Sequence, residues 1–358
     1  MGPTPMAKKR KISDTIAGLK STSAEEKAER RAAAREMELR SAKSTIRHLA
    51  KRVDDLSDAL DSFAAIRESE RIGKRPVRRL QKSDEHHAIA IVTWSDWHVA
   101  ERVDKSKTHG RNAFNPEVCE ARVSALADNS LRMLDVVRSH VRVDEVVLLL
   151  LGDFVTGYLH PELAETNCMG PMEEAFFAQR QLASALETFL GGCKAKRVRI
   201  VCHRGNHGRT TRKMQYKNDY ETSVESFIYW NLRDQFAGDG VEWVIPKSDV
   251  AYTELQPGYL LRSIHGHQIR YGGGVGGISI PLNKWVYRQN ATTPAVLTKL
   301  GHFHTFDPAR TFGINGSIKG WDEFALSLGF AYEPPSQSIE VFDCRRKIVT
   351  ARHPIFCE

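Results

Sequence analysis

The sequence predicts an α/β domain that carries a long, basic helix on its N-terminal side. From residue 88 onward, short apolar runs alternate with amphipathic stretches, which is the pattern of buried strands connected by helices. Residues 24 to 69 are rich in Ala, Glu, Lys and Arg and contain no Pro or Gly, as expected of one long helix. A basic stretch that begins at Gly73-Lys-Arg-Pro76 separates the two parts.

The individual elements follow from the spacing of apolar residues and from local start and stop signals. Asn115 and Pro116 fit the N-cap and the first position of a helix, and Gly191-Gly192 ends another helix. We therefore predict strands over residues 88–94, 146–151, 198–202, 260–264, 295–300, 339–342 and 347–351, and helices over residues 116–139, 171–190 and 220–236.

These elements divide the chain into four parts. Residues 1–24 contain the run Lys8-Lys-Arg-Lys11 and many small polar residues, so we expect a disordered basic tail there. Residues 25–72 form the long helix, residues 73–87 a basic linker, and residues 88–358 the α/β domain. The last part is long enough to bury one large core.

No segment of the sequence predicts insertion into a membrane. The longest apolar run, residues 146–151, is far shorter than the roughly 20 residues that span a bilayer, and the N-terminus has no signal-peptide hydrophobic region. The six cysteines include no CxxC pair, which argues against a disulfide framework or a zinc knuckle. We therefore expect a reduced, cytoplasmic protein.

Most of the net charge lies ahead of the α/β domain. Residues 1–85 hold 21 Lys and Arg against 14 Asp and Glu, so they carry +7 of the formal charge of +8. A basic segment attached to a nearly neutral domain suits a polyanionic partner such as DNA, because neutralising its phosphates releases counterions and this release favours binding. The alternative is a helix whose charges only keep it in solution.

The long helix also has the apolar spacing of a coiled coil. Two sets of apolar residues recur at intervals of seven, offset by three positions: Leu39, Ile46, Val53 and Leu60, then Ala42, Leu49, Leu56 and Phe63. Such a stripe, with β-branched residues in the first set and Leu in the second, favours a parallel homodimer. The alternative is an amphipathic helix that packs on its own α/β domain.

Five of the predicted strands end at a group of Asp, Asn or His residues. The carboxyl ends of strands in open α/β sheets are where such folds bind their ligands. A lone Asp-x-His or Gly-Asp pair is common by chance, but five such groups in order are not. In chain order the groups are Asp96-Trp-His98, Gly152-Asp153, Gly205-Asn-His207, His265-Gly-His267 and Gly301-His-Phe-His304.

These residue types suit a pair of divalent metal ions. Two metals roughly 3.5 to 4 Å apart need a bridging carboxylate and further nitrogen or oxygen ligands. Imidazole together with carboxylate favours Mn, Fe, Zn or Ni over Mg or Ca, and no thiolate is present in the five groups. We expect two divalent metal ions, with Mn as the first choice and Fe, Zn or Ni as alternatives.

The ordered set D-x-H, GD, GNH, H and GHxH, over residues 88–317, resembles the calcineurin-like metallophosphoesterases. The resemblance implies a metal-dependent phosphoesterase with a four-layer αββα sandwich, here with the basic helical extension in front. It also implies the ligands of two metals that share Asp153 as a bridge. One metal would be held by Asp96, His98, Asp153 and His304, and the other by Asp153, Asn206, His265 and His302.

By the same resemblance, His207 stands beside the leaving group as general acid or electrostatic stabiliser, while a metal-bridging hydroxide attacks phosphorus in line. One position departs from the family pattern. Members of the family usually carry Asp or Glu after GNH, whereas this chain has Gly208. The sequence therefore leaves open which group orients His207.

The motifs specify phosphoester hydrolysis but not its substrate. Arg204 and Arg209 flank the GNH group and are candidate phosphate contacts, the alternative being a solvated loop. His160 lies in a loop where related DNA-repair nucleases carry a substrate-contacting His. The layout resembles phage-borne DNA-repair exonucleases (SbcD-like nucleases), which implies a DNA nuclease. The alternatives are a small-molecule phosphomonoesterase or phosphodiesterase, and a chiefly DNA-binding structural protein.

Overall fold

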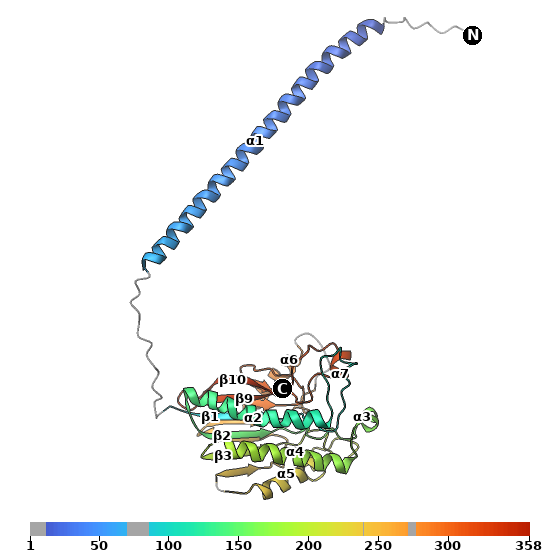
Figure 1. Cartoon of the computed structure of the whole chain (residues 1–358), viewed down its shortest axis with the longest axis vertical. Coiled ribbons are helices and arrows are strands. Elements are labelled where there is room, and N and C mark those ends of the chain that lie inside the picture. The colour runs from blue at the N-terminus through green and yellow to red at the C-terminus, as the bar shows by residue number, and fades with distance from the viewer. Residues whose placement is uncertain (1–11, 70–85, 239, 271–276) are drawn as a thin grey trace, which may run out of the picture. The chain divides into compact units, whose positions relative to one another are not determined.

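The structure is a computed structural model that describes residues 12–69, 86–238, 240–270 and 277–358. The chain divides into two compact units, Met1–Leu80 and Gln81–Glu358, and each is described by itself. Figure 1 draws both units and labels their elements. Among the described helices, none is both long enough and apolar enough to cross a membrane.

The described part of the first unit is a single helix, α1 (Ile12–Ser69). Residues 12–24, which we expected to be disordered, are therefore helical. No Pro interrupts the chain between Pro5 and Pro76, and a helix extends at low cost once it is nucleated. The rest of the predicted tail (residues 1–11), the end of the predicted helix (residues 70–72) and most of the predicted linker (residues 73–85) lie outside the described residues.

The apolar stripe of α1 includes large side chains that are exposed, from 54% for Leu49 to 68% for Leu60. A row of exposed Leu, Ile and Val side chains is the kind of surface that a coiled-coil partner buries. The predicted homodimer stays a prediction.

The second unit is an α/β fold with two sheets. The larger sheet has the strand order β10-β9-β1-β2-β3-β4, and the smaller has the order β5-β6-β7-β8. Strands β1 to β4 run parallel to one another, β9 pairs antiparallel with β1, and β10 pairs antiparallel with β9. In the smaller sheet β6, β7 and β8 are parallel, while β5 pairs antiparallel with β6. The strands of the larger sheet are β1 (His87–Trp94), β2 (Arg142–Leu150), β3 (Arg197–Cys202), β4 (Val241–Val244), β9 (Ser336–Asp343) and β10 (Ile348–Phe356). Those of the smaller sheet are β5 (Ala251–Gln256), β6 (Tyr259–Ser263), β7 (Leu297–Leu300) and β8 (Phe312–Ile314).

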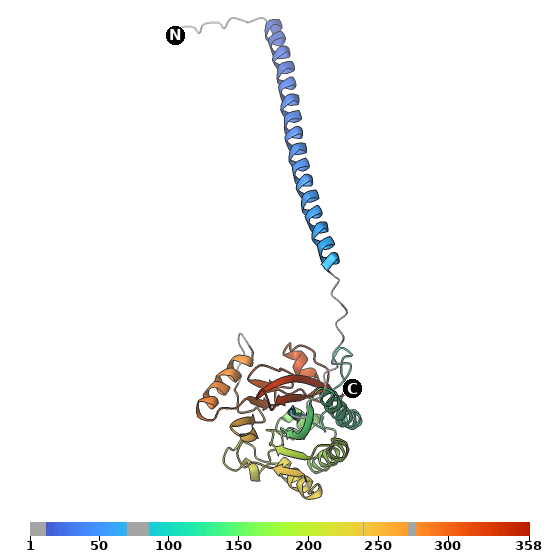
Figure 2. The same cartoon turned by 90° about the vertical axis from the view of Figure 1, so that its left-hand side faces the viewer.

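Helices connect the strands and cover the outer faces of the sheets. Figure 2 shows the helices of residues 116–235, in green to yellow, on one side of the sheets and α6, in orange, on the other. The helices of this unit are α2 (Pro116–His140), α3 (Pro161–Thr166), α4 (Pro171–Gly192), α5 (Val224–Gln235), α6 (Ser279–Thr292) and α7 (Glu323–Ser327), with a 3-10 turn η1 (Asp219–Glu221).

The core lies in three clusters that follow from the alternation of side chains along the strands. In β1, Ala90 and Val92 pack with residues of α2, α4 and α5, whereas Ile89 and Ile91 pack with residues of the smaller sheet. A third cluster joins Leu282 of α6 to β7 and β8. Burial on both faces explains why residues 88–92 of β1 and residues 146–150 of β2 are continuous apolar runs in the sequence.

All seven predicted strands and the predicted helices are present, with shifted ends. The predicted helix over residues 220–236 is divided, because Ser223 caps α5 by accepting a hydrogen bond from the N–H of Glu225. The elements β4, β5, β8, α3, α6 and α7 are absent from the prediction. They are short or half-exposed, so they lack the continuous apolar runs on which the prediction depended.

A buried ion pair joins the two sheets. Lys299 on β7 donates hydrogen bonds to Glu340 on β9 at 2.5 Å and to Ser338 at 2.9 Å, and all three side chains are buried. Burial lowers the pKa of Lys299, while Glu340 acts in the opposite direction. A charge at this depth is tolerated only with its partner in place.

We therefore expect Lys299→Ala to lower the free energy of unfolding by about 3 to 5 kcal/mol, because it leaves the Glu340 carboxylate buried without a partner. The matched variant Lys299→Met with Glu340→Leu removes both charges and should be close to the wild type or more stable. Urea unfolding measures both. A double variant as unstable as Lys299→Ala would contradict this account.

Candidate metal centre

The predicted site residues follow the carboxyl ends of five strands that come from both sheets. The strands β1, β2 and β3 belong to the larger sheet, and β6 and β7 belong to the smaller one. Asp96 and His98 follow β1, Asp153 follows β2, Asn206 and His207 follow β3, His265 follows β6, and His302 and His304 follow β7. The site is thus assembled where the loops of the two sheets meet.

The atoms that can bind metal form two groups. Within each group they lie within 4.8 Å of one another; one group is Asp96, His98 and His304, and the other is Asp153, His265 and His302. Asn206 belongs with the second group, because its Oδ1 is 3.2 Å from His265 Nε2. The structure therefore brings together all seven residues that were selected as ligands from the sequence. Asp153 lies with the second group, and its bridging role stays a prediction.

The backbone at these residues is strained. Eight described residues other than glycine have positive φ angles, and five of them are site residues: Asp96, His98, Asp153, His302 and His304. A left-handed conformation crowds the Cβ atom of an ordinary residue and costs roughly 1–2 kcal/mol. Such strain persists only where the surroundings enforce it, and it concentrates at functional sites.

Three hydrogen-bond acceptors converge in the second group. His265 Nδ1 donates to the Leu151 carbonyl at 2.6 Å, so in the neutral ring Nε2 carries a lone pair. That nitrogen lies 3.0 Å from Asp153 Oδ2 and 3.2 Å from Asn206 Oδ1. Acceptors this close repel one another unless a positive charge lies among them. The nitrogen and oxygen donors fit a divalent cation of the kind predicted.

The same crowding determines how His265 titrates when no cation is bound. Burial by itself lowers the pKa of His265, but the carboxylates of Asp153 and Asp96 and the hydrogen bond to the Leu151 carbonyl together raise it to about 9. The proton then supplies the positive charge. A metal that binds this group has to displace that proton.

The first group shows similar crowding. His98 Nε2 and His304 Nε2 face each other at 3.1 Å, and His304 Nε2 is 3.4 Å from Asp96 Oδ1. Burial, together with the neighbouring His207, lowers the pKa of His98, which favours the neutral imidazole that binds metals. The other nitrogen of His98 lies 4.0 Å from the Glu101 carboxylate.

The loop after β3 comes very close to the loop after β2. A Cβ atom built on Gly205 would overlap the Asp153 carboxylate, so only glycine fits at this position. The approach lets the N–H of His207 donate to Asp153 Oδ1 at 2.8 Å. The glycine of the GNH group thus allows the close backbone contact that the site requires.

His207 is oriented by the main chain. Its Nδ1 donates to the Thr156 carbonyl at 2.6 Å, which leaves Nε2 free to meet a substrate. Glu174 holds this segment in place by accepting hydrogen bonds from the N–H groups of Thr156 and Gly157. The Thr156 carbonyl therefore orients His207, although position 208 carries glycine in place of an acidic residue.

Glu225 is a site residue that was not selected from the sequence. It is buried on α5, and its two carboxylate oxygens accept from the N–H of Phe154 at 2.7 Å and of Gly205 at 2.6 Å. It thereby ties together the loops after β2 and β3. A Cβ atom on Gly208 would stand 2.8 Å from the Glu225 Cγ, so Glu225 fills the space beside position 208. No local motif marks it in the sequence.

The three candidate substrate contacts differ in their surroundings. Arg204 is buried, and its guanidinium is paired with Asp219 at 2.8 Å, so this charge is already engaged within the protein. His160 is exposed at the start of α3, with its ring centre 6.0 Å from that of His207. Arg209 is half-buried and donates to the Asn206 carbonyl at 2.8 Å. Their contacts with a substrate stay predictions, and the ion pair makes Arg204 the weakest of the three.

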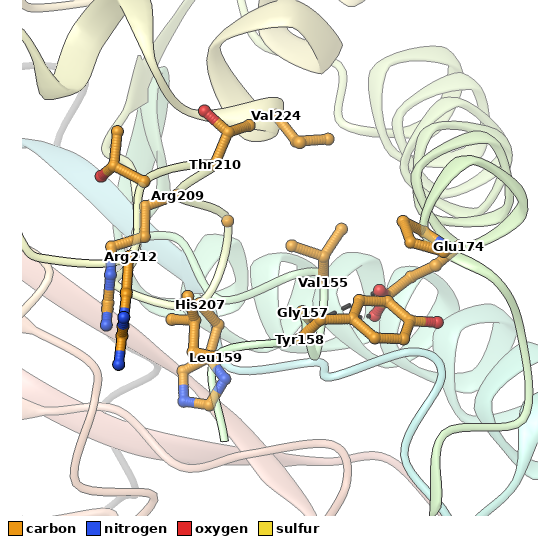
Figure 3. Close-up of a pocket in the computed structure, with 13 residues that line it drawn as sticks. Val155, Gly157, Tyr158, Leu159, Glu174, His207, Arg209, Thr210, Arg212 and Val224 are labelled. Atoms are coloured by element: carbon orange, nitrogen blue, oxygen red, sulfur yellow. Dashed lines mark hydrogen bonds between the residues drawn. The ribbon is translucent and has the colours of Figure 1, made fainter. Parts of the chain in front are cut away.

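A pocket of about 410 Å³ opens beside His207. Figure 3 shows His207, Arg209 and Arg212 along one side and Tyr158 and Glu174 along the other. The volume falls within the range of small-ligand sites. Two guanidinium groups beside a histidine suit an anionic ligand.

We expect Glu225→Gln to weaken Mn²⁺ binding about 10- to 100-fold, the usual effect of changing a group that positions metal ligands. The amide offers one oxygen where the carboxylate offers two, so one of the two loop N–H groups loses its acceptor. Titration calorimetry measures the affinity. As a control, Glu221→Gln changes an exposed glutamate of η1 and should leave binding unchanged. Wild-type affinity in Glu225→Gln would show that this carboxylate does not position the site.

Comparison with known proteins adds no relative. A scan of the sequence against protein-family models gives no match, and a search of curated proteins gives none either. What the site does is therefore inferred from the geometry and chemistry of its own residues.

Proposed function

We propose that this protein is a metal-dependent phosphodiesterase that cleaves DNA, and that its α/β unit is the four-layer αββα sandwich of the calcineurin-like metallophosphoesterases. One observation carries the proposal. Seven residues of the predicted types, which follow five strands of two sheets, converge in two adjoining groups of metal-binding atoms. Native folds rarely leave buried polar atoms without partners, so this many acceptors in one place favour a cation as their common partner.

The proposed cofactor is a pair of divalent metal ions, with Mn as the first choice. Asp96, His98 and His304 would hold one ion and Asp153, Asn206, His265 and His302 the other, with Asp153 shared. When bound, such ions polarise phosphoryl oxygens and make water available as a nucleophile near neutral pH. The protein contributes fixed ligands, since both groups are held by backbone contacts between the loops.

The side chains around the centre have separate roles in this proposal. His207 points Nε2 away from the Thr156 carbonyl and, when protonated, can donate to the oxygen of the departing alcohol. Arg209 would neutralise charge on the phosphate, and its own guanidinium is fixed by the Asn206 carbonyl. His160 would meet the substrate from the exposed side of His207.

DNA is favoured as the substrate class by the charge of the N-terminal arm. Residues 1–85 carry +7, and a basic segment attached to a phosphate-cleaving centre raises the local concentration of a polyanion. A small-molecule phosphoester is the second candidate. The observation in its favour is the pocket beside His207, whose volume of about 410 Å³ suits a ligand of nucleotide size.

The assay that tests the function compares four substrates with Mn²⁺ present: labelled single-stranded DNA, duplex DNA, bis-p-nitrophenyl phosphate and p-nitrophenyl phosphate. We expect cleavage of DNA and of the diester. Asp153→Asn and His265→Ala should abolish both while the protein stays folded, because these side chains hold metals rather than the core. Substantial turnover in either variant would refute the metal assignment. Cleavage of the small esters alone would favour the second candidate.

His207→Ala separates acid catalysis from metal binding. We expect the bound metal, measured by elemental analysis, to persist while the rate falls by about 10² to 10⁴ on substrates with a poor leaving group. Esters of p-nitrophenol need less help from an acid and should lose less. An equal loss on both kinds of substrate would instead indicate that His207 only positions the phosphate.

We also propose that α1 pairs with a second copy of itself. In the full chain, Leu49→Asp with Leu56→Asp places charges in the apolar stripe and should convert a dimer into a monomer. Ser41→Asp with Ser44→Asp adds the same charge away from the stripe and should leave the dimer intact. Light scattering gives the mass. An unchanged mass in the Leu49 and Leu56 variant would exclude the stripe as the dimer contact.

A further inference from the structure

A strip of exposed aromatic side chains lies on and just after α7. Phe324, Phe330 and Tyr332 are 67%, 52% and 37% exposed, and we call these three residues the aromatic strip. The rings of Phe324 and Phe330 contact each other edge to face, with 6.5 Å between their centres. Large apolar side chains that gather on a surface usually mark a binding site.

The aromatic strip is anchored next to the first group of metal-binding residues. Glu333, the residue after Tyr332, accepts a hydrogen bond at 2.9 Å from the N–H of Phe306, two residues beyond His304. At the other end of the segment, Lys319 donates to Asp322 and to Glu101, and the Glu101 carboxylate lies 4.0 Å from His98. The strip therefore borders the His98 and His304 side of the centre.

Cationic side chains accompany the aromatic strip. The Arg111 guanidinium lies 5.4 Å from the centre of the Tyr332 ring. Its loop, residues 101–111, is fastened to α7, because Glu323 accepts a hydrogen bond from the N–H of Asp104 at 2.8 Å. We call this segment the Arg111 loop. Its exposed cations are Arg102, Lys105, Lys107 and Arg111.

The carboxylates around these cations have partners inside the protein. In the Arg111 loop, Glu101 is paired with Lys319, and Asp104 accepts hydrogen bonds from Ser106. On the α7 side, Asp322 is buried in its pair with Lys319. The loop thus holds four Lys and Arg against two carboxylates, and its net charge is positive.

We propose that the aromatic strip and the Arg111 loop form a binding surface for single-stranded nucleic acid. The inference rests on the proposed function, because it assigns a substrate form to the same centre. Exposed rings stack on unpaired bases, and basic side chains beside them follow the backbone phosphates. Duplex bases are already stacked and present no free face. The surface thus selects a single strand and leads it toward the metal centre.

The aromatic contribution is tested in the full chain with Phe324→Ala and Phe330→Ala combined. Both rings are more than half exposed, so the melting temperature should stay close to that of the wild type. Fluorescence anisotropy in EDTA, which prevents cleavage, gives the affinity for a labelled single strand and for its duplex. We expect the single-strand Kd to rise at least about 5-fold for each ring removed, and the duplex Kd to change little.

Two controls separate this surface from the N-terminal arm and from general surface effects. Phe227→Ala removes a ring on α5 that is 57% exposed, and it should leave both affinities unchanged. Raising the salt concentration about threefold weakens the electrostatic contribution of the arm far more than stacking.

Arg111→Gln should reduce the slope of log Kd against log salt by about 0.7 for a single strand.

The outcomes for the surface and for the proposed function can be told apart. Unchanged single-strand affinity in the double variant would overturn the inference and leave the strip to a protein partner. An equal loss for the duplex would overturn the preference for single strands. Hydrolysis of bis-p-nitrophenyl phosphate by the wild type is independent of both results. If the wild type hydrolyses no bis-p-nitrophenyl phosphate with any metal tried, but the aromatic strip still controls single-strand binding, the proposed function is refuted and the binding surface is not.

Discussion

Asp153 stands where the loops of the two sheets meet, and its contacts constrain the rest of the site. One carboxylate oxygen accepts the N–H of His207, and the other faces His265. The Asp153 carbonyl accepts a hydrogen bond from the N–H of His98, and the Gly152 carbonyl accepts one from the N–H of Asp96. The loops after β1, β2, β3 and β6 are therefore positioned relative to one residue. A shift of Asp153 would disturb the loop ends of both sheets.

Two buried carboxylates hold in place the loops that carry the site residues. Glu225 accepts from the loops after β2 and β3, and Glu174 accepts from the segment whose carbonyl orients His207. Both carboxylates are buried, and burial raises the pKa of each. Buried carboxylates are costly unless their hydrogen bonds are made, so their positions are specified by the N–H groups they satisfy. Helices α4 and α5 thus set the geometry of loops to which they do not belong.

Several features could be predicted from the sequence because they depend on local pattern. Runs such as the one in β2 are largely apolar, since both faces are buried, and the residue groups that follow each run mark the edge of the sheet. Other features depend on contacts that no local pattern reveals. Glu225 lies 18 residues beyond His207, and the group that orients His207 is a main-chain carbonyl. In the same way, the sequence around Arg204 does not show that this arginine is buried in an ion pair.

The left-handed backbone at five of the site residues has a consequence for how the protein can change over time. Glycine adopts positive φ freely and would relax the backbone at each of these positions. At Asp96 and Asp153 it would also remove the acceptors of the His302 and His207 N–H groups, so losing a ligand can make the fold more stable only at the three histidines. Selection for stability alone would therefore tend to erode the centre. Side chains that remain at such positions have to be retained by some other benefit, and the proposed metal binding would supply one.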